Sequence, residues 1–247
     1  MRSLLGLAFL CGCATATGDP SSPPAPPPPS AAPAGPVVLE LFTSQGCSSC
    51  PPADRFLNQL AAKGSSGGRA VAPLAFHVDY WNDLGWADPY SAAAWTQRQS
   101  QYAESIGDDR VYTPELVVGG AAGVVGNQPS SVEHAIASAA PPAILAATSS
   151  WTGSTLSIDV TAPPAADVWV AIWEDGTRTS IPRGENAGTT ASADRVVRQL
   201  SRVATAGQHA TLSIPLTAGF KPGGAVAFAQ GANRHIVASA LLPPPPR

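Results

Sequence analysis

The sequence has few cysteines, and their positions limit what the protein can be. Only four occur in 247 residues. Cys11 and Cys13 lie in a signal-like N-terminal segment, so Cys47 and Cys50 are the only thiols of the remaining chain. No second disulfide can therefore cross-link the fold. A zinc site built from two cysteine pairs is excluded, because the second pair is missing.

Charged residues are also scarce. They make up 13% of the chain, and the formal net charge is −3. Proteins that bind nucleic acid normally carry a basic surface, so this composition argues against nucleic acid as a partner. The apolar run at residues 4–10 is too short to form a membrane-spanning helix.

Residues 1–18 have the features of an export signal. Arg2 provides the charged end, residues 4–10 provide the apolar core, and the small residues before Cys13 resemble a bacterial lipobox. This pattern predicts a lipid on Cys13, and the alternative is ordinary cleavage after residues 14–16, which read Ala-Thr-Ala. In both cases we expect an exported protein of the periplasm or cell envelope, where disulfides persist.

Residues 19–36 are almost entirely Pro, Ala, Ser and Gly. Such a segment cannot bury enough apolar area to fold, and it favours an extended conformation. It is predicted to be a semi-rigid tether, with an unanchored tail as the alternative. The remaining chain is long enough for two modest domains, which we expect at residues 37–140 and 141–247.

The most informative stretch is residues 37–60. An apolar run of β-forming residues leads through a turn into Cys47-Ser-Ser-Cys50 and then into a segment with apolar residues at helical spacing. Pro51 and Pro52 predict that the helix begins at about Pro51, with Cys50 at its cap. We expect Cys47 to be the nucleophile and Cys50 the resolving thiol, with a modestly lowered pKa at Cys47.

The following segments predict an α/β domain. An apolar run at residues 70–78 is followed by a helix that begins at the Asp88-Pro89 signal and ends before Gly107. Residues 112–118 and 121–125 read as a hairpin, and a capping box at residues 130–133 opens a last helix that runs through residue 140. The predicted order is β, α, β, α, β, β, α.

This order, together with Cys47, Cys50 and the Thr113-Pro114 pair before the third strand, resembles the thioredoxin fold. The resemblance implies that Pro114 is a cis-proline facing the dithiol, and that Thr113 and Pro114 offer a backbone edge to a substrate polypeptide. Tyr112 and Trp81 are further candidates for substrate binding. The motifs at residues 41–54, 76–81, 111–114 and 183–188 resemble those of an uncharacterised bacterial family of exported thioredoxin-like proteins with a C-terminal extension.

Glu40 is the candidate for proton transfer. Thioredoxin-like proteins carry a buried acidic residue in the first strand beneath the dithiol, and Glu40 lies one residue further from the first cysteine than that residue does. A one-residue shift on a strand moves a side chain to the opposite face unless the turn absorbs it. Two interpretations stay open: Glu40 is buried beneath the dithiol as a proton acceptor, or it reaches solvent or an arginine.

Residues 77–88 are rich in polar and aromatic side chains and should lie on the same side as the dithiol. This segment, which contains His77, Trp81, Trp86 and Asp88, could form a substrate-recognition wall. A copper or zinc site of Cys47, Cys50 and His77 is a second interpretation. Simple packing of the aromatic residues is the third.

Short β runs with turn residues between them dominate the chain beyond residue 141. They predict a small antiparallel β-rich domain packed on the first one. Residues 195–204 are ambiguous, because Val196, Leu200 and Val203 have helical spacing while the alternation typical of a strand is poor. The loop at residues 183–188 either reaches over the dithiol and binds substrate or is ordered by its own hydrogen bonds.

The sequence as a whole predicts an exported thiol–disulfide oxidoreductase that needs no cofactor and acts on protein or small-molecule thiols and disulfides. The alternative is a lipoprotein that handles copper or zinc or binds a partner, in which the Cys47–Cys50 pair is a ligand pair or a structural disulfide.

Overall fold

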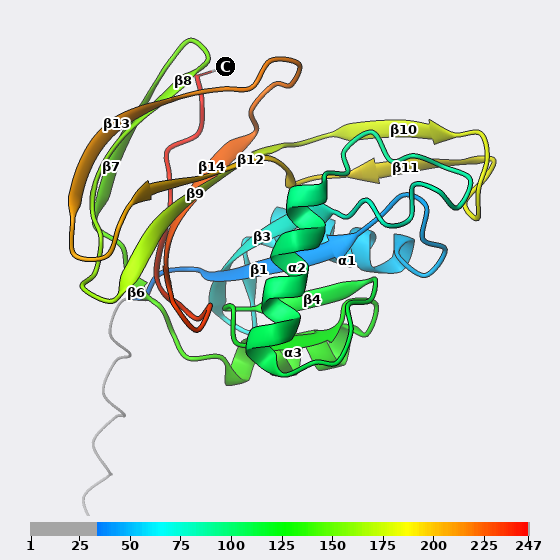
Figure 1. Cartoon of the computed structure of the whole chain (residues 1–247), viewed down its shortest axis with the longest axis horizontal. Coiled ribbons are helices and arrows are strands. Elements are labelled where there is room, and N and C mark those ends of the chain that lie inside the picture. The colour runs from blue at the N-terminus through cyan, green and yellow to red at the C-terminus, as the bar shows by residue number, and fades with distance from the viewer. Residues whose placement is uncertain (1–33, 247) are drawn as a thin grey trace, which may run out of the picture. The chain divides into compact units, whose positions relative to one another are not determined.

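The computed structural model describes residues 34–246 (Figure 1). The predicted export signal at residues 1–18, lipidation at Cys13 and nearly all of the tether at residues 19–36 lie outside the described residues. Three helices are present in the described part: α1 (Pro51–Lys63), α2 (Ala93–Ile106) and α3 (Pro129–Ser138). The strands are β1 (Val37–Thr43), β2 (Ser65–Ser66), β3 (Arg69–His77), β4 (Glu115–Val118), β5 (Ala122–Val125), β6 (Ala143–Ile144), β7 (Ala147–Thr152), β8 (Thr155–Thr161), β9 (Ala166–Glu174), β10 (Thr177–Ile181), β11 (Thr189–Ala193), β12 (Val196–Ala204), β13 (His209–Pro215), β14 (Gly224–Gly231) and β15 (Ile236–Leu241).

A mixed sheet of ten strands organises the molecule. Its order is β5-β4-β1-β3-β12-β9-β14-β15-β6, with β2 paired to β3. Strands from both sides of residue 140 belong to this sheet, since β12 lies parallel to β3 with Val196 opposite Ala75. The residues expected to form two domains therefore share one hydrogen-bonded sheet, and the predicted mixed α/β class is confirmed.

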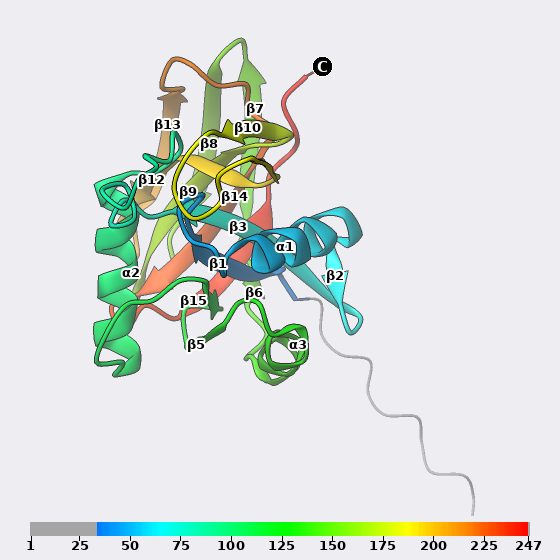
Figure 2. The same ribbon diagram turned by 90° about the vertical axis from the view of Figure 1, so that its right-hand side faces the viewer.

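The alternation of side chains along β1 determines what lies on each face of the sheet. Leu39 and Leu41 pack with α1 and α3, whereas Val38 and Phe42 pack with α2. Figure 2 shows α2 on one side of β1 and β3, with α1 and α3 on the other. Because both faces are covered, every residue of β1 is buried.

A second core forms where the long strands β9, β12 and β14 extend beyond α2. Val168, Val170 and Ile172 of β9 pack against the three-stranded sheet β13-β8-β7. The alternate residues Ala171 and Trp173 face the α2 side. Figure 1 shows β7, β8 and β13 beside β9 and β14 at one end of the molecule, and the β10–β11 hairpin extends from the opposite end of these strands toward the start of α1.

Helix α1 begins where it was predicted, but the other two helices do not. Cys50 is the N-cap of α1, as the two prolines indicated. The predicted start of α2 at Asp88-Pro89 is wrong: the helix begins at Ala93, because the Asp88 carboxylate accepts hydrogen bonds from loop groups and Ala92 is extended. The prediction that a capping box at residues 130–133 opens the last helix is also wrong, since α3 begins at Pro129 after the N-cap Gln128.

Candidate functional site

The Cys47–Cys50 pair forms a disulfide in the turn between β1 and α1. Its two Cα atoms are 5.4 Å apart, and the Cys50 N–H donates to the Cys47 carbonyl at 3.2 Å. Cys47 lies one turn before the helix, as predicted. The hydroxyl of Ser49 contacts the Cys47 sulfur at 3.3 Å. Neither cysteine exposes any surface (0%), so a reacting partner needs a local movement to reach the sulfurs.

The predicted Thr113-Pro114 element lies against this turn. The peptide bond between the two residues is cis. Ser49 Oγ donates to the Thr113 carbonyl at 3.4 Å, and Trp81 Nε1 donates to Thr113 Oγ1 at 2.8 Å. The structure therefore brings Thr113, Pro114 and Trp81 together beside the dithiol. Tyr112 lies further away, where its carbonyl accepts from Gln99.

Residues 182–188, which we call the strap, connect β10 to β11 and cross the dithiol turn. Asn186 Nδ2 donates to the carbonyls of Gln45 and Cys47, both at 2.9 Å. Glu185 accepts from the Ser48 N–H at 3.1 Å.

The strap also meets the loop after β3, since a Cβ added to Gly184 would lie 3.0 Å from Trp86 Cβ. The strap therefore reaches over the dithiol turn, and it is also ordered by hydrogen bonds of its own, such as that from the Ala187 N–H to the Gly184 carbonyl at 3.2 Å.

Glu40 is buried, but on the α2 face of the sheet. Its carboxylate accepts hydrogen bonds from Arg98 and from the Tyr102 hydroxyl. Gln230 of β14 donates to the same hydroxyl at 2.8 Å, so the cluster joins β1, α2 and β14.

Glu40 shares its face with Val38 and Phe42, and Leu39, Leu41 and Thr43 take the α1 face. The turn therefore does not absorb the one-residue shift, and Glu40 points away from α1.

A different carboxyl, that of Asp54, lies on α1 one helical turn after Cys50. Asp54 is in the first turns of α1, four residues after Cys50, and its N–H donates to the Cys50 carbonyl. Side chains with this spacing are neighbours on a helix face. Thr43 of β1 donates to Asp54 Oδ1 at 2.7 Å. Asp54 was not predicted as a site residue, although its spacing from Cys50 and its place beside the inward-facing Ala53 and Leu57 are visible in the sequence.

Burial raises the pKa of Asp54 to about 6, against the opposite effects of the nearby His77 charge and the Thr43 hydrogen bond. A carboxyl with this pKa can exchange a proton near neutral pH.

His77 and Asp88 form a buried pair on the same side of the sheet. His77 Nδ1 lies 2.7 Å from Asp88 Oδ2, which also accepts from the Gln45 N–H at 2.7 Å. Burial alone lowers the pKa of His77, but the Asp88 carboxylate more than offsets this, so the pKa lies above its usual value. His77 Nε2 is buried and has no hydrogen-bond partner among the described residues.

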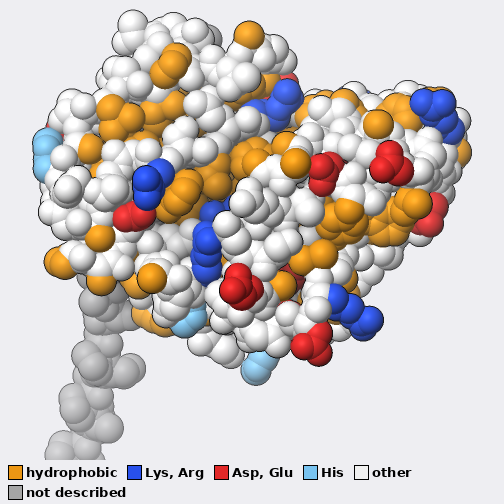
Figure 3. Space-filling model, viewed as in Figure 1, with side chains coloured by type: hydrophobic (Ala, Val, Ile, Leu, Met, Phe, Trp, Pro, Cys, Tyr) orange, Lys and Arg blue, Asp and Glu red, His pale blue; other side chains and the backbone are white. Residues whose placement is uncertain are grey.

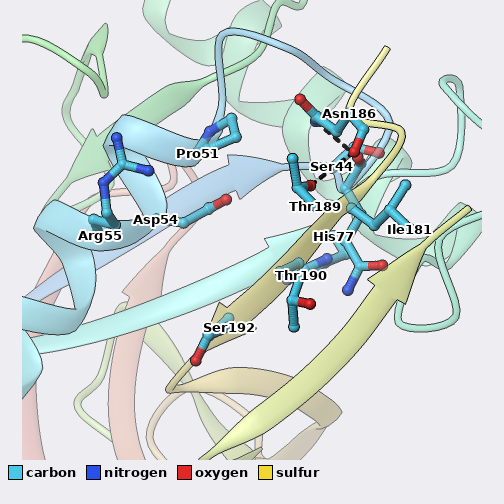
Figure 4. Close-up of a pocket in the computed structure, with 13 residues that line it drawn as sticks. Ser44, Pro51, Asp54, Arg55, His77, Ile181, Asn186, Thr189, Thr190 and Ser192 are labelled. Carbon is cyan, nitrogen blue, oxygen red and sulfur yellow. Dashed lines mark hydrogen bonds between the residues drawn. The ribbon is translucent and has the colours of Figure 1, made fainter. Parts of the chain in front are cut away.

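A cavity of about 260 Å³ lies between the start of α1 and the β10–β11 hairpin. Figure 4 shows Asp54 and Arg55 on one side of it and the hydroxyls of the hairpin on the other. Its lining includes Ser44, Asp54, His77, Asn186, Thr190 and Ser192.

The ionisation of Asp54 should make stability depend on pH. The unfolded carboxyl loses its proton near 3.8 and the folded one near 6, so the folded state binds more protons between these values and stability falls as pH rises through them. We expect Asp54→Asn, which keeps an acceptor for Thr43, to stabilise the protein by about 1–3 kcal/mol at pH 7 and to lose this advantage below about pH 4.

Urea unfolding at pH 4 and pH 7 measures this difference. The exposed Asp83 provides the matched control, and Asp83→Asn should change the free energy of unfolding little at either pH. An Asp54→Asn protein that is less stable than wild type at pH 7 would contradict the argument.

Within residues 34–246, no group of three or more His, Cys, Asp or Glu side chains is placed to hold a metal ion. Within the same residues, no helix combines the length and the hydropathy that crossing a bilayer requires. On the face shown in Figure 3, Lys and Arg side chains are scattered rather than gathered into one patch.

Comparisons with other proteins identify the family but not the reaction. No curated protein matches the chain significantly. A crystal structure of a protein from Agrobacterium tumefaciens is similar, with 30% sequence identity and a TM-score of 0.67 over 86% of this chain and 96% of that one. HBP35 of Porphyromonas gingivalis is similar in fold alone, with 15% identity and a TM-score of 0.59 over 84% of this chain and 74% of that one. The family model described as "Protein of unknown function (DUF1223)" matches residues 38–230, and the chain therefore belongs to that family.

Proposed function

We propose that this protein is an exported thiol–disulfide oxidoreductase with a thioredoxin-like site, acting on protein or small-molecule thiols and disulfides. The observation that carries the proposal is the Cys47–Cys50 disulfide at the start of α1, with the Thr113-Pro114 element held against it through Ser49. Two sulfurs this close can alternate between a dithiol and a disulfide.

The exchange proceeds through a mixed disulfide. In the reducing direction, the Cys47 thiolate attacks one sulfur of a substrate disulfide, and the other substrate sulfur leaves as a thiolate. The Cys50 thiol then loses its proton and attacks Cys47 Sγ, so that the Cys47–Cys50 bond forms and the second substrate thiolate is released. The substrate disulfide is reduced by two electrons as the protein dithiol is oxidised, and the reverse sequence oxidises a substrate dithiol.

Three residues beside the turn are suited to hold the substrate. The edge at Thr113 and Pro114 can align a polypeptide next to Cys47, and Trp81, anchored on Thr113, supplies an aromatic wall. The strap covers the same turn through Asn186 and Glu185, so a substrate has to displace it or bind along it.

Asp54 is better placed than Glu40 to receive the Cys50 proton. Asp54 shares the helix face and the first turns of α1 with Cys50, whereas the polar contacts of Glu40 are with the α2 side. A pKa of about 6 lets Asp54 accept a proton at neutral pH and release it again.

We further propose that residues 1–18 direct export, with lipidation of Cys13 or cleavage after residue 16, and that residues 19–36 tether the folded part to the cell envelope. An oxidising compartment is consistent with the disulfide.

A structural disulfide is the second candidate, and one observation favours it: both cysteines are completely buried. In a binding protein whose fold is cross-linked by the Cys47–Cys50 disulfide, no reacting partner would need to reach the sulfurs.

A redox titration separates the two candidates. Thiol trapping in glutathione and dithiothreitol buffers, on the chain from residue 19 onward, reports only Cys47 and Cys50 because no other cysteine is present. We expect a midpoint between about −120 and −270 mV, the range of known oxidases, isomerases and reductases. A pair that stays oxidised below about −300 mV is a structural disulfide and contradicts the proposed function.

A further inference from the structure

The cavity between the start of α1 and the β10–β11 hairpin is lined by a buried group that the exchange reaction does not use. His77 is one of the residues that line this cavity, and its buried Nε2 has no hydrogen-bond partner among residues 34–246. Leaving a buried nitrogen of this kind unpaired is costly, so such atoms usually have a water, ion or functional role. The other nitrogen, Nδ1, is held by Asp88, which keeps the ring in one orientation.

The register of the sheet places His77 close to Asp54. Thr43 of β1 is the direct neighbour of His77 on the parallel strand β3, so the two side chains project from the same face about 5 Å apart. Thr43 already donates to Asp54 Oδ1. Figure 4 shows the Asp54 carboxyl directed from α1 into the space that His77 borders.

We propose that the His77–Asp88 pair is a proton relay that connects Asp54, through the cavity, to solvent at the β10–β11 hairpin. This proposal rests on the proposed function, because a relay has a use only if Cys50 gains and loses a proton. The proposed substrate edge is at Thr113 and Pro114, whereas the cavity is lined by the hairpin, the start of α1 and Asn186 of the strap, so the cavity offers the proton a separate route. A cavity of about 260 Å³ is large enough for several water molecules.

Each proton is accounted for along this route. Cys50 loses its proton to the Asp54 carboxylate as the Cys50 thiolate forms. Because Asp54 is now neutral, the His77 imidazolium is stabilised by the Asp88 carboxylate alone, and Nε2 releases its proton to cavity water and so to solvent. The free Nε2 then accepts the proton of Asp54 by way of cavity water, which restores the ionised Asp54 and the imidazolium.

The charges around His77 suit this role. Asp88 faces it from the loop after β3 and Asp54 from α1, with Arg55 beside Asp54. Arg198 of β12 also lies near His77, and its charge is paired with Glu174 of β9. The ring of Tyr90 contacts the imidazole edge-on. Two carboxyls, against an arginine whose charge is already paired with Glu174, favour a positively charged His77 when Asp54 is ionised.

The test is the pH dependence of disulfide closure. Reduced protein, residue 19 onward, is mixed with oxidised glutathione, and release of glutathione from Cys47 is followed by stopped flow from pH 4.5 to 8.5. In the wild type we expect the closure rate to fall below about pH 6, as Asp54 becomes protonated. We call this fall in rate at low pH the acid limb of the profile. In His77→Gln we expect the midpoint of the acid limb to move upward by about one pH unit and the rate at pH 7 to fall about tenfold.

Two companion variants make the test specific. Asp88→Asn leaves the imidazole without its anchor and should shift the acid limb in the same direction by a smaller amount. The matched control is His209→Gln, which removes an exposed histidine of another His–Asp pair, with Asp159, and should leave the profile unchanged. Added imidazole should restore closure in His77→Ala, a rescue that a purely structural role for His77 does not predict.

The outcomes separate the relay from the proposed function. If the wild type does not react with oxidised glutathione, the proposed function fails and the relay fails with it. If the wild type reacts and a folded His77→Gln keeps its acid limb and rate, only the relay is overturned. If the His77 variants do not fold, NMR titration of His77 in the wild type decides: its apparent pKa should differ between the dithiol and disulfide forms, and an identical value in both overturns the relay.

Discussion

Replacing Cys50 by serine is expected to trap Cys47 in mixed disulfides with exported proteins. Cys47 still attacks a substrate disulfide, but no second thiol can release the product, so the covalent intermediate accumulates. Multiple turnover should fall by at least about 10³-fold, on the scale of losing a residue that forms covalent intermediates. Non-reducing gels of acid-quenched cells, followed by mass spectrometry, detect the trapped partners.

The single variant Cys47→Ser is the control for this trap. It retains Cys50, which lies at the helix cap beneath the turn, and should form no adducts because the attacking sulfur is gone. Equal trapping by both variants would mean that either sulfur is attacked at random and that the assigned roles are wrong. Absence of trapping by Cys50→Ser in a folded protein would favour the structural disulfide.

Loss of the buried Arg98 should have the largest effect on stability. Arg98 and Glu40 are both at least 96% buried, and the guanidinium also contacts Tyr102 and the ring of Phe228. Arg98→Met leaves the Glu40 carboxylate in the core without a cationic partner, so we expect a loss of about 3–5 kcal/mol in the free energy of unfolding. Urea denaturation at pH 7 measures it.

The double variant Glu40→Leu/Arg98→Met tests the reason for this loss. Because both charges are removed, most of the stability should return, since a buried ion pair is often replaceable by apolar residues. The more exposed pair Arg202–Asp167 gives the matched control, and Arg202→Met should cost no more than about 1 kcal/mol. A double variant as unstable as Arg98→Met would show that lost packing, rather than the unpaired charge, causes the effect.

Two single variants separate Glu40 from Asp54 as the proton acceptor. Glu40→Gln should lower stability but leave the pH dependence of disulfide closure unchanged, because the Glu40 carboxylate faces α2. Asp54→Asn should remove the acid limb.

Local signals were enough to predict the parts of the site that are close together in the chain. The strand–dithiol–helix unit, the start of α1 at Pro51 and the Thr113-Pro114 element before β4 each depend on short-range patterns and on the conformational limits of proline. Strands β8, β9, β10, β13, β14 and β15 were found by the same means, whereas β6, β7 and β11 were not predicted and the segment of β12 was left ambiguous. The start of α2 was predicted wrongly because the Asp88 carboxylate accepts a hydrogen bond from Gln45, which is distant in the sequence. The start of α3 was predicted wrongly because the helix begins at Pro129, one residue before the predicted capping box.

What the sequence determined by itself is therefore the dithiol, its position at a helix start, and the α/β order around it. Only the tertiary structure decided which face of β1 carries Glu40, which carboxyl lies beside Cys50, and how residues 141–246 complete the site. Contacts such as Asn186 to Cys47 and Gln45 to Asp88 join residues 139 and 43 positions apart. The alternation of a strand tells which residues share a face, but the partner on that face depends on packing between distant segments, and no local pattern encodes it.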